Sequence, residues 1–467
     1  MRKIIHASFV VGSLTKGKDK LRFPFRELNV PWVTLFFLMR LLSMLCAMGW
    51  AVLGVAAEAD FPLADAKECH PRAGLPNFLA KAQTPGAAIK VAYLGGSITA
   101  QPGWRVKSLA YFKSQYPQAN FVEINAAIGG TGSDLGVFRL QQDVLAKKPD
   151  LLFVEFAVND GGAAPETIMR NMEGIVRQTW KAFPQCDICF VYTLVEGMAP
   201  TIAGGKFQRS ASAMELVAEH YQIPTIHFGL EVSRLSKEGK VLWKAPLPKT
   251  PEQKAEVGDK IVFAPDSVHP HVETGHQMYL EAIQRSWPAI QKGSTTAGEH
   301  RLAAPLRANN SERAQLVSIA KVQASAGVEV ADMAKDPFAG KWSVRLPAML
   351  KLTKPGQSLE FKFKGTHCAI YDVIGPAGGK VAVTLDQRPA KVYTRFDAYC
   401  VYDRLSTFTV GTDLPDEVHQ VKIELLPEAF DKAAILSQNK NKIDKPERFE
   451  GRYFYPGAVL ILGEMAP

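Results

Sequence analysis

Features that would indicate a bound metal, a nucleotide or a repeat architecture are missing from this 467-residue sequence. Cys186-Asp-Ile-Cys189 has the spacing of a zinc knuckle or a redox motif, but no second Cys/His pair accompanies it. Gly129-Gly-Thr-Gly132 lacks the spacing and the following lysine of a phosphate-binding loop. No internal repeat occurs at a solenoid or propeller period. We therefore expect no metal and no other cofactor.

An excess of positive charge is also largely missing from the part of the chain that should fold. The formal net charge is +9, but residues 1–57 hold eight basic and two acidic residues, which leaves only +3 for the remainder. A nearly neutral region does not predict the basic groove that tracks a nucleic-acid backbone. We therefore expect no nucleic-acid partner.

The N-terminal segment has the features of a leader and signal peptide. Residues 41–57 are apolar, follow Arg40 and end in Val55-Ala-Ala57, so cleavage should leave Glu58 or Asp60 as the first residue. We therefore expect an exported protein, either periplasmic or secreted. The alternative is an uncleaved membrane anchor, because apolar residues resume upstream at 32–38.

Few cysteines remain once this leader is removed. Their number is odd, so at least one is unpaired. Cys368 and Cys400 are candidates for a disulfide in an exported protein, and the sequence leaves that pairing open. The five remaining cysteines are Cys69, Cys186, Cys189, Cys368 and Cys400.

The first folded region alternates strands with helices. Between about residues 86 and 290, short β-type runs are separated by helical patterns. This alternation predicts an α/β fold, a three-layer, doubly wound parallel sheet with helices on both faces. The five predicted strands are residues 88–94, 121–125, 151–156, 188–193 and 225–228.

The second region has a different periodicity. Residues 359–363, 381–385 and 421–425 alternate strictly between apolar and polar, which predicts an antiparallel β-sandwich. Before them, Ser, Thr, Gly, Ala and Asn accumulate without periodicity, as in a linker. Because this linker isolates the second region, we expect a chain ending near Ser294 to keep whatever activity the first region has. The predicted domains are residues 1–57, the leader; 60–291, the α/β domain; 292–313, the linker; and 314–467, the β-sandwich.

A serine follows the first predicted strand. Gly95-Gly96-Ser97 places Ser97 at the carboxyl end of a parallel strand, where open α/β sheets bind ligands, and the glycines permit a tight turn that exposes Oγ. Thr99 stands where the general nucleophile elbow has its second glycine. Taken alone, Ser97 therefore also fits the role of a helix N-cap.

A carboxylate and an imidazole with catalytic spacing lie near the end of the same region. In Asp266-Ser-Val-His269-Pro270 a turn allows Asp266 to accept from Nδ1 of His269, which leaves Nε2 free to face a nucleophile. His271 and His276 are nearby competitors for the role of the base; His271 lacks a carboxylate at this spacing, and His227 is expected to pack in the core.

Acyl transfer also needs hydrogen-bond donors for the developing oxyanion. Gly130 follows the second predicted strand and offers an unobstructed backbone N–H, while Asn159 follows the third strand and offers an amide. Each residue alone is equally typical of an ordinary loop.

Taken in order, these four segments resemble the sequence blocks of the SGNH (GDSL-type) hydrolases, over residues 88 to about 287. The resemblance implies the flavodoxin-like fold of that superfamily and a serine esterase without a cofactor. It implies that Ser97 is the nucleophile, that Asp266 and His269 activate it, and that Ser97, Gly130 and Asn159 form the oxyanion hole. Two positions depart from the usual pattern: Gly96 stands in place of Asp, and Ala157 in place of Gly.

The branch of the superfamily suggests the substrate. The start around Ser97, followed by Gly103-Trp104-Arg105, and the jelly-roll-like C-terminal region resemble carbohydrate esterases. We therefore expect hydrolysis of O-acyl, foremost O-acetyl, esters on a polysaccharide or oligosaccharide through an acyl-enzyme. The alternatives are a lipase or thioesterase acting on acyl chains, and a non-catalytic glycan-binding protein with a vestigial hydrolase domain.

The expected partner is an acylated carbohydrate or another ester substrate. A membrane partner is expected only if the leader stays uncleaved. The oligomeric state is left open.

Overall fold

The computed structural model describes residues 61–467 of the chain. The expected leader, residues 1–57, lies outside this range. Within it, no helix combines the length and the apolar character needed to cross a membrane. We call residues 61–293 the α/β region and residues 314–467 the β region.

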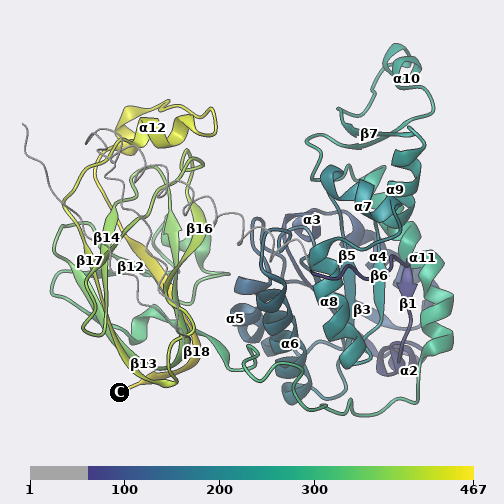
Figure 1. Cartoon of the computed structure of the whole chain (residues 1–467), viewed down its shortest axis with the longest axis horizontal. Coiled ribbons are helices and arrows are strands. Elements are labelled where there is room, and N and C mark those ends of the chain that lie inside the picture. The colour runs from purple at the N-terminus through teal and green to yellow at the C-terminus, as the bar shows by residue number, and fades with distance from the viewer. Residues whose placement is uncertain (1–60) are drawn as a thin grey trace, which may run out of the picture. The chain divides into compact units, whose positions relative to one another are not determined.

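A six-stranded sheet forms the centre of the α/β region (Figure 1). Its five parallel strands are the five predicted runs, each within one residue of the expected bounds, so this part of the fold prediction is confirmed. A short edge strand, which the sequence pattern did not predict, pairs antiparallel with the last parallel strand. The strands in spatial order are β1 (Cys69–His70), β6 (Thr225–His227), β5 (Asp187–Tyr192), β4 (Leu151–Glu155), β2 (Ala88–Gly95) and β3 (Asn120–Asn125).

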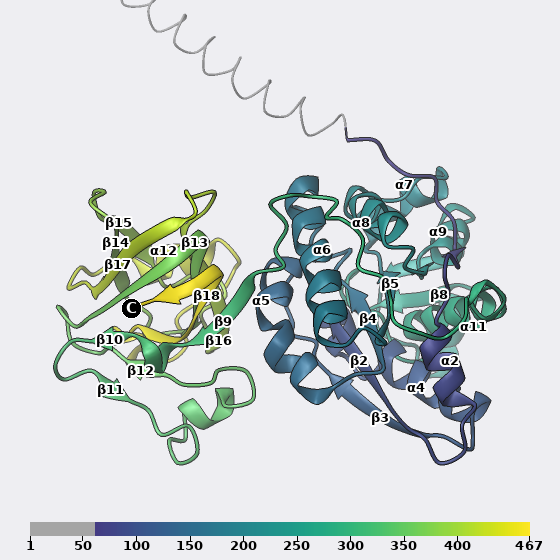
Figure 2. The ribbon, with the colours of Figure 1, turned by 90° about the horizontal axis from the view of Figure 1, so that it is seen from below.

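Helices cover both faces of this sheet, which gives the predicted three layers (Figures 1 and 2). On one face, α6 (Pro165–Ala182) begins at a proline and buries an apolar stripe that includes Ile168, Met172 and Ile175. Its neighbours there are α5 (Ser133–Asp143) and α8 (Arg209–His220). On the other face lie α2 (Pro76–Ala82), α4 (Trp104–Gln115) and α11 (Gly275–Gly293).

Shorter elements connect these layers. A second, two-stranded parallel sheet pairs β7 (Val241–Lys244) with β8 (Ile261–Ala264). The remaining elements of the α/β region are α3 (Ser97–Ala100), η1 (Leu145–Lys147), η2 (Glu196–Met198), α7 (Ala199–Ala203), α9 (Leu230–Lys237) and α10 (Pro251–Val257).

The β region is an antiparallel sandwich, also as predicted. Its longest strand, β13 (Ser358–Ile374), changes register near Gly365, where a Cβ atom would lie 2.3 Å from the carbonyl oxygen of Leu462. The first half of β13 pairs with β17 (Glu417–Leu425) and the second half with β16 (Arg404–Gly411). Apolar side chains of these strands fill a separate core.

Most other strands of the β region extend its eight-stranded sheet, two short strands form a separate antiparallel pair, and the remaining elements are short helices. In that sheet, β18 pairs with β13 on one side and with β9 on the other. The other elements of the β region are β9 (Ala314–Ser318), η3 (Ile319–Lys321), β10 (Gln323–Ala324), β11 (Glu329–Val330), η4 (Ala339–Trp342), β12 (Leu350–Lys351), β14 (Lys380–Leu385), β15 (Lys391–Thr394), α12 (Lys432–Ser437), α13 (Pro446–Phe449) and β18 (Tyr455–Ala466).

The segment between the two regions has no helix or strand, but it is fixed to the α/β region. His300 Nε2 lies 2.7 Å from Oδ1 of Asp187, and its ring stacks on Trp180. The carboxylate of Glu173 accepts the backbone N–H groups of Leu306 and Arg307. Residues Phe61–Pro467 accordingly form one compact unit, and the domain boundaries at 291 and 314 stay a prediction.

The five cysteines among residues 61–467 are all unbonded. Cys368 and Cys400 are buried and form no disulfide with each other. Burial raises the pKa of the Cys400 thiol to about 12. These thiols are therefore protonated at neutral pH and serve as small core side chains.

Candidate active site

Ser97 opens the short helix α3 at the carboxyl end of β2. The two glycines before it are required by close approaches. A Cβ atom at Gly95 would lie 2.7 Å from Oγ1 of Thr99, and one at Gly96 would lie 1.9 Å from Oδ1 of Asn159. The aspartate that the resemblance expects at position 96 would therefore displace Asn159.

Asp266 and His269 lie in the loop after β8 and form a hydrogen-bonded chain with Ser97. Nδ1 of His269 is 2.7 Å from Oδ2 of Asp266, and Nε2 is 2.8 Å from Oγ of Ser97. Ser267, with φ of 70°, makes the turn that brings the carboxylate back over the imidazole. Oδ1 of Asp266 accepts the backbone N–H groups of Val268 (3.0 Å) and His269 (2.8 Å).

These contacts settle the direction of the hydrogen bonds. Burial alone would raise the pKa of Asp266, but the N–H groups of His269 and Val268 and the imidazole outweigh it and hold the pKa below its usual value. The ionised Asp266 only accepts, so Nδ1 of His269 donates to it, and the lone pair of Nε2 faces the Ser97 hydroxyl. The side chain of His269 is 35% exposed, so a substrate can reach it.

The two candidate oxyanion donors from other strands lie beside Ser97. A Cβ atom at Gly129 would lie 3.6 Å from Cβ of Ser97, and the next residue, Gly130, has a φ of +72°. Among residues 61–467, apart from Gly130 and its two chain neighbours, no residue has an atom within 4 Å of the Cβ position of Gly130, so this backbone faces open space. The side chain of Asn159 lies over Gly96. The structure thus brings all five predicted site residues to one edge of the sheet.

The competing histidines have other partners. His271 Nε2 bonds the carbonyl of Ala245, 2.9 Å away. His276 accepts the backbone N–H of Trp104 at Nδ1, and its burial lowers the pKa to about 3. His227 is likewise neutral and lies in the core, as predicted. Of these four histidines only His269 hydrogen-bonds Ser97.

The analysis of the sequence missed Glu155, a buried carboxyl group beneath the Ser97 turn. Its two oxygens accept the hydroxyls of Thr99 (2.8 Å) and Thr193 (2.6 Å), and it also accepts the backbone N–H of Gly96. Burial raises its pKa despite these three donors. A glutamate within the otherwise apolar run 151–156 is the signal that could have identified it, because an unpaired charge there would be costly.

Gly103-Trp104-Arg105 supports the same turn from its other side. Trp104 Nε1 donates to Oγ1 of Thr99, and Arg105 Nε donates to the Thr99 carbonyl. A Cβ atom at Gly103 would lie 2.2 Å from the ring of His276, which explains the glycine. These residues hold α3 and make no contact with the reacting atoms.

Asp160, next to Asn159, caps the helix that follows the Gly130 loop. Its Oδ1 accepts the N–H of Ser133, the first residue of α5, at 2.9 Å. Among the described residues no donor reaches Oδ2, which is buried. Burial raises the pKa of this carboxyl group to about 7.

We expect this carboxyl group to make the stability of the protein depend on pH. Its folded-state pKa of about 7 lies above the usual value of 3.8, so the folded state binds more protons between these values, and the free energy of unfolding falls as pH rises through this window. Asp160→Asn keeps an acceptor for Ser133 and cannot ionise. Urea unfolding at pH 5 and pH 8 should therefore show a smaller loss of stability in the variant than in the wild type. Equal losses would contradict the assignment.

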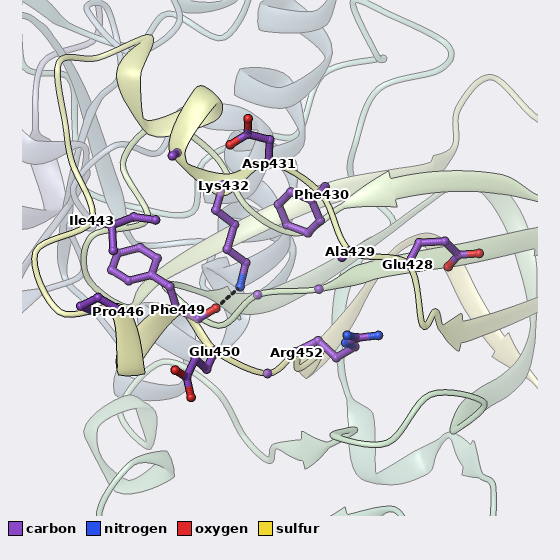
Figure 3. Close-up of a pocket in the computed structure, with 14 residues that line it drawn as sticks. Glu428, Ala429, Phe430, Asp431, Lys432, Ile443, Pro446, Phe449, Glu450 and Arg452 are labelled. Atoms are coloured by element: carbon purple, nitrogen blue, oxygen red, sulfur yellow. Dashed lines mark hydrogen bonds between the residues drawn. The ribbon is translucent and has the colours of Figure 1, made fainter.

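The structure also contains a cavity of about 440 Å³ in the β region (Figure 3). Lys432, Phe430, Phe449 and Arg452 are among its lining residues. Lys432 Nζ donates to the carbonyls of Pro376 and Phe449, and burial lowers its pKa to about 8. No predicted site residue lines this cavity, so it is distinct from the Ser97 site.

Comparison with known families finds a match within the α/β region. Residues 93–277 match the model of the GDSL-like Lipase/Acylhydrolase family. This stretch includes Ser97, Gly130, Asn159, Asp266 and His269. No curated protein sequence matches the chain.

Two solved structures resemble both regions. One is a two-domain esterase (CEX) active on acetylated mannans, co-crystallised with mannopentaose. It is 21% identical, with 85% of this chain and 97% of that chain covered and a TM-score of 0.64. A second structure of the same esterase is also 21% identical, with 85% and 98% covered and a TM-score of 0.63. At this identity the likeness shows a shared fold, with an α/β region followed by a β region.

Proposed function

We propose that this chain, a carboxylic ester hydrolase whose residues 93–277 form a GDSL-like lipase/acylhydrolase domain, removes O-acyl groups, foremost acetyl, from a carbohydrate. One observation carries the chemistry: Nε2 of His269 lies 2.8 Å from Oγ of Ser97, while its Nδ1 lies 2.7 Å from the ionised Asp266. A hydroxyl with an oriented base at this distance is an activated nucleophile.

In the acylation step, Oγ of Ser97 attacks the ester carbonyl and its proton passes to Nε2 of His269. The negative charge that develops on the carbonyl oxygen is stabilised by the N–H groups of Ser97 and Gly130 and by the amide of Asn159. Asp266 stabilises the imidazolium. The intermediate then collapses: the C–O bond to the sugar breaks, and His269 returns the proton to the leaving sugar oxygen.

Deacylation repeats these steps with water. His269 takes a proton from a water molecule, which attacks the acyl carbon on Ser97. The same donors stabilise the second oxyanion. When the bond from the carbonyl carbon to Oγ of Ser97 breaks, His269 protonates Oγ, and the free acid leaves and loses its remaining proton to solvent.

The proposed substrate class rests on the architecture of the two regions together. The esterase that matches 85% of this chain acts on acetylated mannans, and the match extends over the α/β region and the β region alike. This likeness supports a glycan ester as the substrate, and ester assays distinguish it from a lipid ester.

We expect 4-nitrophenyl acetate to be hydrolysed with a higher kcat/KM than the octanoate and palmitate esters, because an acetyl esterase needs only a small acyl pocket. The same enzyme should release acetate from acetylated mannan or xylan oligosaccharides, measured by an enzyme-coupled acetate assay. Preference for the long-chain esters would establish the lipase alternative instead. Failure to cleave any ester, in a protein that folds, would favour a glycan-binding role.

A further inference from the structure

The β region supplies a side chain to the loop that carries Gly130. Arg345 follows η4 and is mostly buried, with its side chain 22% exposed. Its Nη2 donates to the carbonyl of Ala127 at 3.0 Å, and its Nη1 lies 3.2 Å from Oδ2 of Asp143 on α5. From the same helix, Gln142 Nε2 donates to the backbone carbonyl of Arg345 at 3.0 Å.

Asp143 joins Arg345 to a second, fully buried arginine. Arg139 Nη1 lies 2.9 Å from the same oxygen of Asp143 and also donates to the carbonyl of Ala126. Its Nη2 reaches the carbonyl of Gly95, two residues before Ser97, at 3.4 Å. One carboxylate thus holds two guanidinium groups against backbone carbonyls on both sides of the site.

These contacts fix successive peptide planes of the loop that carries Gly130, residues 126–131. In the plane between residues 126 and 127, Arg139 holds the carbonyl and Asn125 Oδ1 accepts the N–H. In the next plane, Arg345 holds the carbonyl of Ala127 and the Gly95 carbonyl accepts the N–H of Ile128 at 3.0 Å. Because a peptide unit is planar, a hydrogen bond at each end leaves it little freedom to rotate.

The third plane is also held, and the glycines follow directly. Thr131 Oγ1 donates to the carbonyl of Ile128 at 2.9 Å. Gly129 then lies against Ser97, and Gly130 presents its backbone to open space. Glycine is the most mobile residue in the backbone, so the position of the Gly130 N–H depends on the planes before it.

The position of Arg345 is itself fixed by the β region. The next residue, Leu346, is buried, and a Cβ atom at Gly457 of β18 would lie 2.5 Å from its Cδ1. Leu346 belongs to one apolar cluster with Leu135 and Val137 of α5. The guanidinium is therefore presented by a packed segment, which makes it a rigid support.

From this arrangement we infer that Arg345 is a positioning residue for the oxyanion hole, through which the β region takes part in catalysis. The inference rests on the proposed function. Without the β region, the carbonyl of Ala127 loses its hydrogen bond from Arg345, and Asp143 keeps only one of these two guanidinium partners, Arg139. The expectation that a chain ending near Ser294 keeps its activity is replaced by the expectation that it loses part of its kcat.

The test compares Arg345→Ala with Arg345→Lys and with a matched control. Arg170→Ala removes another ion pair between the two regions, Arg170 Nη1 to Oδ1 of Asp413 at 3.1 Å, without touching residues 126–131. For 4-nitrophenyl acetate we expect kcat of Arg345→Ala to fall roughly 10- to 100-fold with KM within about twofold, because misplacing a donor affects the transition state. Arg345→Lys should retain an intermediate kcat, and Arg170→Ala should match the wild type.

Binding of a trifluoromethyl ketone inhibitor distinguishes loss of positioning in the oxyanion hole from a general loss of protein stability. Ser97 Oγ bonds to its carbonyl carbon, the carbonyl oxygen becomes an oxyanion, and the serine proton stays on His269. Its affinity should therefore fall by the same factor as kcat/KM in Arg345→Ala. Adding guanidinium chloride at low millimolar concentration should restore part of the lost kcat. Wild-type kcat and inhibitor affinity in a folded Arg345→Ala would overturn the inference.

Hydrogen exchange distinguishes failure of the inference about Arg345 from failure of the proposed function. If the wild type cleaves no ester, or if Ser97→Ala keeps full activity, the proposed function is wrong. The amides of residues 126–131 still report on Arg345 in that case, because they should exchange faster in Arg345→Ala than in Arg170→Ala. Equal exchange in the two variants would show that Arg345 does not hold the loop. If Arg345→Ala does not fold, Arg345→Lys gives the same comparison.

Discussion

Ser97→Ala and His269→Ala should each lower kcat for 4-nitrophenyl acetate by about 10⁴- to 10⁶-fold, because one removes the bond-forming atom and the other its base. Oγ of Ser97 and Nε2 of His269 lie 2.8 Å apart and act as a unit. The double variant should therefore be about as slow as the slower single variant. Pre-steady-state kinetics with the aryl acetate in excess would also show no acyl-enzyme burst in either variant.

His271→Ala is the matched control for the base. His271 lies two residues from His269, but its Nε2 bonds the carbonyl of Ala245 and does not face Ser97. Its replacement should leave kcat within a few-fold of the wild type. An inactive His271→Ala together with a fully active, folded His269→Ala would show that the wrong imidazole has been assigned. Multiplicative losses in the Ser97/His269 double variant would show that the two residues do not act together.

The architecture followed from the hydrophobic periodicity. Mostly apolar runs such as residues 151–156 become parallel strands covered on both faces, while the alternating runs 359–363 and 421–425 become antiparallel strands with one buried face. The short edge strand β1 was not predictable, because two residues carry no periodicity and its pairing with β6 depends on the tertiary fold.

The residues of the candidate site were predictable for a different reason. Each follows a strand or a turn signal, and parallel strands end at the same edge of a sheet, so residues 97, 130 and 159 had to meet there. The spacing of Asp266 and His269 carries its own geometry, since a turn of three residues returns the carboxylate to Nδ1. The roles of these residues stay a prediction until they are tested by substitution.

The supports of the site could not be predicted in the same way. Arg345 lies 215 positions from Gly130 in a different region, and no local pattern links an arginine after η4 to a carbonyl at residue 127. The segment 292–313 was interpreted as a linker from its composition. Its contacts with Asp187 and Glu173 are long-range hydrogen bonds, which composition does not encode.

The fixed orientation of His269 leads to the second large expected effect, the loss in Asp266→Asn. Oδ1 of the asparagine would still accept the N–H groups of Val268 and His269, so the turn should fold as before. Its Nδ2 would then replace Oδ2 and donate to Nδ1 of His269, which must become the acceptor. The imidazole proton would move to Nε2 and face the Ser97 hydroxyl, so no lone pair is left to take the serine proton.

We therefore expect kcat of Asp266→Asn to fall by up to about 10⁴-fold with KM nearly unchanged, because the tautomer affects the chemical step and leaves the binding surface intact. Asp259→Asn, an exposed substitution of the same kind before β8, is the matched control and should stay at the wild-type rate. A ¹⁵N spectrum of the His269 ring would report the tautomer directly: the proton should be on Nδ1 in the neutral wild-type imidazole and on Nε2 in the variant. Since Asp266 is 48% exposed, water competes for Nδ1, and a loss below tenfold would mean that water alone orients His269 well enough. In that case the carboxylate would be needed for the turn that holds the imidazole, and Asp266→Ala, which also removes the acceptor for Val268 and His269, would be the variant that loses activity.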